Sequence, residues 1–108
     1  QLDTWALRYP AAKPRLEYWR AMTRTSDWRS MADIQQTFPR TDPLDSECVI
    51  FDIGGNNWRM FCKVLFPSEP QQKGIIWTRW FGTHNEYDRL SADDKRRICR
   101  PGRGAERR

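Results

Sequence analysis

Three side chains in the second half of the chain could together carry out proton transfer on a phosphate group. His84 is the only histidine among 108 residues, and histidine is the side-chain type that gains and loses a proton near neutral pH. Tyr87 follows three residues later and could hydrogen-bond a phosphate oxygen or stack on a base. Arg59 is a permanent cation that can hold a phosphate through two parallel hydrogen bonds. We therefore take Arg59, His84 and Tyr87 as the candidate catalytic residues.

Two further cations could add positive charge to the same site. Lys63 and Arg79 could bind phosphate groups if their side chains share the face of the sheet that carries Arg59. Simpler interpretations stay open for both. Lys63 lies near a strand end, where it would point to solvent, and Arg79 could lie across Trp77 or Trp80 as a cation–π pair.

The candidate catalytic residues also have structural interpretations. Arg59 is expected to face Asp52 across a hairpin and to form an ion pair with it. That pairing is compatible with function, because a carboxylate can orient a working arginine. A lone histidine in a small protein is more often an ordinary surface or core residue than a catalyst.

Metal and cofactor chemistry finds no support in the sequence. The chain has one histidine and lacks CxxC, HxxxH and HExxH patterns, so we expect neither a metal site nor a cofactor. Its cysteines are odd in number and widely spaced, at Cys48, Cys62 and Cys99. This spacing argues against a disulfide framework and for a reducing compartment.

Length and charge indicate one domain with a basic tail. Residues 95–108 hold seven basic residues and one acidic residue, whereas residues 1–94 hold 12 basic and 13 acidic residues. We expect a single folded domain over residues 1–94 and a flexible tail over 95–108, which either binds a polyanion or is merely solvated. No apolar run is long enough to cross a bilayer, and no signal peptide opens the sequence. We expect a soluble, cytoplasmic protein without membrane contact.

The first half of the chain is expected to be helical. Apolar residues recur at helical spacing in residues 2–9, before Pro10, and again in residues 14–25. Ser30 and Asp33 resemble a capping box that starts a short helix over residues 31–37. The acidic, proline-containing residues 40–47 are typical of a loop.

Antiparallel strands are expected in the second half. If Gly55 and Asn56 form a two-residue hairpin loop between residues 48–53 and 58–66, each pair of facing residues is set. One face then carries only apolar pairs, namely Ile53/Trp58, Phe51/Met60 and Val49/Cys62. The other face carries Asp52/Arg59, Ile50/Phe61 and Cys48/Lys63, with a carboxylate beside a guanidinium. A third strand is expected over residues 74–81, ended by Gly82, but alternation alone does not decide which of its faces is buried.

Two sequence motifs resemble a known family. The first is Phe51-Asp52-Ile53-Gly54-Gly55-Asn56 with Trp58-Arg59, and the second is Gly82-Thr83-His84 with Glu86-Tyr87-Asp88. They occur in the expected order, behind a helix that ends in Ser26-Asp27-Trp28 and an IxxxFP segment. With these pieces, residues 2–90 resemble the HigB-type toxins of bacterial type II toxin–antitoxin systems, in the RelE/ParE-like superfamily.

The resemblance implies a fold, an activity and partners. It implies an α+β toxin with two to three N-terminal helices packed on a small twisted antiparallel sheet. It also implies metal-independent endoribonuclease activity on translated mRNA at the 70S ribosome, and neutralisation by a HigA-like helix-turn-helix antitoxin. Contact with promoter DNA would be indirect, through that antitoxin. Family members usually carry a strand before the first helix, and the chain begins at Gln1 without room for it.

Two other classes of function remain open at this point. Toxins of the ParE type share the superfamily fold and inhibit DNA gyrase without catalysis, so fold alone does not decide the activity. An RNA-binding or antitoxin-binding module that has lost its activity is the other alternative. The set of Arg59, His84 and Tyr87 favours the endoribonuclease, because a gyrase inhibitor has no need of it.

Overall fold

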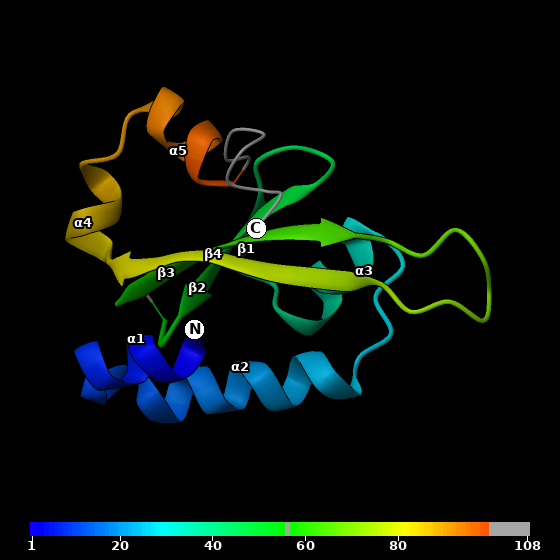
Figure 1. Cartoon of the computed structure of the whole chain (residues 1–108), viewed down its shortest axis with the longest axis horizontal. Coiled ribbons are helices and arrows are strands. Elements are labelled where there is room, and N and C mark those ends of the chain that lie inside the picture. The colour runs from blue at the N-terminus through cyan, green and yellow to red at the C-terminus, as the bar shows by residue number, and fades with distance from the viewer. Residues whose placement is uncertain (56, 100–108) are drawn as a thin grey trace.

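The computed structural model describes residues 1–55 and 57–99, which form an α+β fold (Figure 1). Three helices come first, followed by four strands and two further helices. In chain order these are α1 (Leu2–Arg8), α2 (Lys13–Thr25), α3 (Met31–Thr37), β1 (Thr41–Pro43), β2 (Cys48–Ile53), β3 (Trp58–Leu65), β4 (Ile75–Thr83), α4 (His84–Asp88) and α5 (Ala92–Cys99). The strands form one antiparallel sheet in the order β1-β2-β3-β4. The expected fold class is confirmed.

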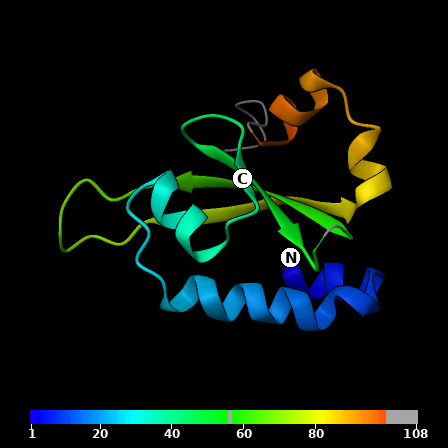
Figure 2. The ribbon, with the colours of Figure 1, turned by 180° about the vertical axis from the view of Figure 1, so that it is seen from behind.

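The N-terminal helices cover one face of the sheet. Figures 1 and 2 show α1 and α2 lying along this face. Aromatic side chains fill the space beneath them. The Trp5 ring of α1 stacks on Phe81, and Trp19 of α2 meets the Phe51 ring edge-on. Both helices thus bury their apolar stripes against β2, β3 and β4.

The hairpin of β2 and β3 has the expected register. All six predicted pairs are present, including Asp52 opposite Arg59 and Phe51 opposite Met60. Gly54 and Gly55 both have positive φ, at 63° and 71°, a region that glycine enters without strain. Asn56, the other half of the predicted loop, lies outside the described residues.

A bulge explains why alternation did not reveal the buried face of β4. The register shifts between Phe61 and Cys62, so Arg79 is an extra residue on the β4 side. Phe81 and Ile76 consequently both face the helices, although they differ by an odd number of residues. Strict period-two alternation separates these residues, and the bulge brings them back to one face.

Two boundaries differ from the sequence prediction. Residues 41–43, expected to be part of a loop, form the short edge strand β1 opposite Val49–Phe51. Pro43 is tolerated there because an edge strand has a side without ladder hydrogen bonds. Gly82, expected to end the last strand, instead lies within β4 opposite Arg59. A Cβ at this position would lie 2.5 Å from the Trp80 ring, so any larger residue here would force that ring to move.

The second face of the sheet is covered by helices that the sequence analysis did not predict. Helix α5 packs on β3 and β4, and Cys99 at its end forms a disulfide with Cys48 of β2. The expectation of a flexible tail from residue 95 is therefore wrong for residues 95–99. The remaining tail residues, 100–108, lie outside the described part of the chain.

The disulfide also corrects the interpretation of the cysteines. Cys48 and Cys99 are 51 residues apart in sequence, yet their Cα atoms lie 6.1 Å apart because α5 folds back over the sheet. The argument from spacing against a disulfide fails here, and with it the argument for a reducing compartment. Cys62 stays free and buried, and burial raises the pKa of its thiol, which keeps that group protonated and unreactive.

None of the helices within residues 1–55 and 57–99 is both long and apolar enough to cross a membrane.

Candidate active site

A capping box positions His84 and Tyr87. The Thr83 hydroxyl accepts a hydrogen bond from the Glu86 backbone N–H, and Glu86 Oε1 accepts one from the Thr83 N–H at 2.8 Å. This reciprocal pair starts α4 at the end of β4. His84 is therefore the first residue of the helix, with Tyr87 one turn later.

Glu86 also ties this short helix to the N-terminal part of the chain. The Tyr9 hydroxyl donates a 2.8 Å hydrogen bond to Glu86 Oε1, and Arg8 Nη2 lies 3.8 Å from Oε2. The Thr83 backbone N–H, followed by the Tyr9 hydroxyl, holds the pKa of the Glu86 carboxyl below its ordinary value of 4.5. Glu86 is thus a positioning residue for α4.

Arg59 lies at the corner where β3, β4 and α4 meet. Its Nε is 3.2 Å from Asp52 Oδ1, and the two side chains are only 10% and 20% exposed. The predicted ion pair is present. Burial raises the pKa of the Asp52 carboxyl above its ordinary value of 3.8, and Arg59 lowers it by a smaller amount.

The ring of Tyr87 packs against aromatic and cationic groups. Its centroid lies 5.8 Å from that of Phe61 and 5.6 Å from Arg59 Cζ. Lys95 Nζ of α5 is closer, at 4.3 Å. These contacts occupy the ring surface that a base would need for stacking. Of the two roles suggested by the sequence, hydrogen bonding through the hydroxyl is the better fit.

His84 is held in place through both its backbone and its side chain. Its backbone N–H donates a 2.9 Å hydrogen bond to the carbonyl of Asn57 in the β2–β3 turn. Its Nε2 lies 3.1 Å from Asp88 Oδ2, one turn later in α4. Nδ1 is buried without a hydrogen-bond partner, whereas the side chain as a whole is 39% exposed. Nε2 is therefore the nitrogen able to exchange a proton with a bound molecule.

The remaining predicted cations lie elsewhere on the sheet. Lys63 is four residues beyond Arg59 on β3, about 13 Å along the strand, and its Nζ lies 5.6 Å from the Trp77 ring centroid. Arg79 occupies the bulge of β4. The structure thus brings together Arg59, Asp52, His84 and Tyr87, while Lys63 stays at a distance from them.

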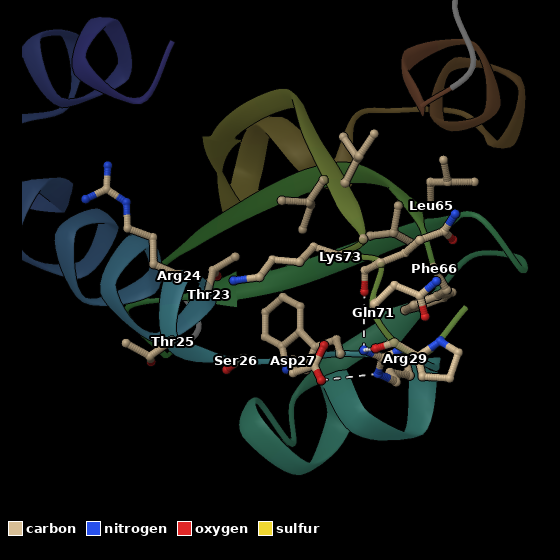
Figure 3. Close-up of a pocket in the computed structure, with 17 residues that line it drawn as sticks. Thr23, Arg24, Thr25, Ser26, Asp27, Arg29, Leu65, Phe66, Gln71 and Lys73 are labelled. Carbon is tan, nitrogen blue, oxygen red and sulfur yellow. Dashed lines mark hydrogen bonds and ion pairs between the residues drawn. The ribbon is translucent and has the colours of Figure 1, made fainter. Parts of the chain in front are cut away.

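A groove of about 490 Å³ lies at the opposite end of the sheet, between the end of α2 and the β3–β4 connection (Figure 3). Residues 23–29, 64–66 and 70–76 line it, and none of the candidate site residues is among them. Arg29 donates hydrogen bonds to the carbonyls of Glu69, Pro70 and Gln72, which fixes the connecting loop. Arg29 therefore has a structural role at this groove.

Among residues 1–55 and 57–99, His, Cys, Asp and Glu side chains form no cluster of three that could hold a metal ion.

Two residues around the site were missed by the sequence analysis. Glu86 could have been found, because Thr83-x-x-Glu86 is the capping-box pattern itself. Lys95 could not, because it was assigned to a flexible tail. Only the folding of α5 over the sheet brings it to Tyr87.

Comparison with known families gives a match over most of the chain. Residues 12–90 match the HigB_toxin family, described as the RelE-like toxic component of a toxin–antitoxin system. The chain belongs to this family. Its match includes Arg59, His84 and Tyr87 and ends before α5. No curated protein gives a significant match to the chain. A HigB-family toxin is one half of a pair, so its partner is an antitoxin.

Proposed function

We propose that this HigB-family toxin is an endoribonuclease that cleaves mRNA during translation on the ribosome. The observation that supports this most strongly is the convergence of Arg59, His84 and Tyr87 at one corner of the sheet. A buried cation from β3 lies there beside a phenol from α4, and an imidazole precedes that phenol by one turn of the same helix. A purely structural role would not require these three groups together.

RNA can be cleaved by attack of its own 2′-hydroxyl on the adjacent phosphate. The reaction needs a base for the 2′-OH proton, donors for the charge that develops on phosphorus-bound oxygens, and an acid for the leaving 5′ oxygen. In our proposal His84 carries protons through Nε2. Arg59 holds the phosphate, and the Tyr87 hydroxyl hydrogen-bonds one of its oxygens. None of these steps requires a metal ion.

The contacts within the site suit these roles. Asp52 fixes Arg59 at 3.2 Å, which leaves less side-chain freedom to lose when RNA binds. Asp88 lies 3.1 Å from His84 Nε2, so it orients the ring and releases that nitrogen when a phosphate approaches. Both carboxylates therefore act as positioning groups in this scheme.

Partners are part of the same proposal. We expect a HigA-like helix-turn-helix antitoxin to neutralise the toxin, the 70S ribosome to present the mRNA, and promoter DNA to be contacted only through the antitoxin. Lys63 and Arg79 remain candidate phosphate-binding residues for RNA that extends along the sheet.

Growth arrest on expression tests the proposal. His84→Ala and Arg59→Ala should each abolish growth arrest, while Arg20→Ala, which removes a cation from an exposed pair with Asp3, should leave it intact. Because Arg59 is buried, Arg59→Met serves as a variant that keeps most of the side-chain volume. Co-purification with the antitoxin shows that each variant is folded. Retained toxicity in both the His84 and the Arg59 variants would favour a non-catalytic inhibitor and refute the proposal.

A further inference from the structure

Helix α5 lies outside the family match but borders the site. The match ends at residue 90, and α5 begins at Ala92. The helix carries consecutive basic residues, two of which are engaged in its own ion pairs, Arg96 with Asp93 and Arg97 with Asp94. The third, Lys95, reaches the ring of Tyr87 in α4 instead.

The ammonium of Lys95 lies at the candidate active site. Its Nζ is 4.3 Å from the Tyr87 ring centroid, and Arg59 Cζ is 5.6 Å from the same centroid. Two cations thus border one phenol. A phosphate that accepts a hydrogen bond from the Tyr87 hydroxyl would lie within the field of both, because charges are screened over about 8 Å at physiological salt.

The position of Lys95 depends on the far end of its helix. Cys99 is buried and bonded to Cys48 of β2. Lys95 and Cys99 are four residues apart, so they share one face of α5. The bond that anchors Cys99 to the sheet therefore also turns Lys95 toward Tyr87. A helix of eight residues is too short to be stable on its own, so α5 depends on this bond and on its packing on β3 and β4.

We propose that Lys95 is a further phosphate-binding residue of this site, held in place by the Cys48–Cys99 disulfide. The inference rests on the proposed RNA-cleaving function and names a binding residue that the family match does not include. Lys95 and Arg59 would both bind the RNA backbone beside Tyr87.

The same arrangement makes RNA binding sensitive to reduction. A dithiol reductant donates two electrons and two protons, breaks the sulfur–sulfur bond, leaves thiols on Cys48 and Cys99, and becomes a cyclic disulfide itself. Helix α5 then loses its covalent anchor, and Lys95 is no longer held beside Tyr87.

Binding of a labelled single-stranded 2′-O-methyl RNA measures this effect without cleavage, because the probe lacks the attacking hydroxyl. The logarithm of the association constant falls linearly with the logarithm of the salt concentration. Loss of one phosphate contact should make this line less steep by about 0.7, which corresponds to roughly fivefold weaker binding at 0.1 M salt. We expect this change for Lys95→Gln and for the reduced wild type. Lys95→Arg should bind like wild type. Arg96→Gln removes the same charge from the same helix and should leave the slope unchanged.

Two results would overturn the inference. One is an unchanged salt slope in Lys95→Gln. The other is an equal loss of binding on reduction in Lys95→Gln and wild type, which would assign the redox effect to another part of the chain. Thermal unfolding of each variant shows whether weaker RNA binding comes from loss of the contact or from loss of the folded state. Absence of RNA cleavage by wild type would instead refute the proposed function. The binding comparison does not depend on that result, because the 2′-O-methyl probe cannot be cleaved.

Discussion

Arg59 is the residue on which the other groups of the site converge. It pairs with Asp52 on β2, faces Gly82 on β4 and lies beside the ring of Tyr87. The pair with Asp52 was predictable, because the register of a tight hairpin follows from its turn. Its contact with Tyr87 was not, since that distance depends on how α4 turns over the sheet.

The buried Asp52–Arg59 pair leads to a prediction for both stability and activity. Asp52→Asn removes the carboxylate beside the buried Arg59 guanidinium. Because that cation stays buried, the substitution should lower the free energy of unfolding by roughly 3 kcal/mol. The same substitution loosens Arg59, and misplacing a phosphate-binding group typically lowers cleavage tenfold to a hundredfold. Urea unfolding and the rate of RNA cleavage measure the two effects.

Asp3→Asn is the matched control, because it removes a carboxylate from an exposed ion pair with Arg20 at 3.6 Å. Asp3→Asn should change neither the free energy of unfolding nor the rate of RNA cleavage. An Asp52→Asn variant that cleaves RNA at the wild-type rate would show that Asp52 does not position Arg59.

Among the elements, the β2–β3 hairpin was the most predictable and α5 the least. Strict alternation and a glycine turn specify the hairpin locally. The bulge at Arg79 breaks the alternation of β4, and nothing in the local pattern marks it. Helix α5 is strongly charged, and only its disulfide and its packing on the sheet distinguish it from a solvated tail.

Helix α4 has a pH-dependent anchor in Glu86. The folded state holds the pKa of this carboxyl below its ordinary value of 4.5, so the folded state binds its proton less tightly than the unfolded state does. The resulting stability is present above the unfolded pKa and is lost as the pH falls through the folded pKa. Glu86→Gln should lower the free energy of unfolding by about 1 kcal/mol at pH 7. This difference from wild type should shrink below about pH 4.

Urea unfolding from pH 7 to pH 3 measures that difference, with Glu17→Gln on α2 as a control for the loss of an exposed carboxylate. If wild type and Glu86→Gln differ by the same amount at both ends of the range, the charge of Glu86 contributes nothing to the cap.

At the scale of the molecule, the two faces of the sheet have different roles. One face packs against the N-terminal helices, and the other carries the candidate active site. Helices α1 to α3 cover the first face (Figure 2), and aromatic side chains fill the space between them and the sheet. On the second, α4 and α5 leave a corner in which Arg59, His84, Tyr87 and Lys95 gather. The family, the fold class and three of these four residues could be predicted from the sequence. Lys95 could not, because a contact between distant segments leaves no local pattern.

The central claim is that this corner cleaves RNA, and mapping of 5′ ends on a defined mRNA tests it most directly. The mRNA is incubated with the purified toxin, with and without translating ribosomes, and His84→Ala serves as the control. We expect new 5′ ends only where ribosomes translate, and none with His84→Ala. Cleavage of naked RNA would keep the enzyme but remove the ribosome from its mechanism. An mRNA left intact in both settings would contradict the claim that the protein is an endoribonuclease.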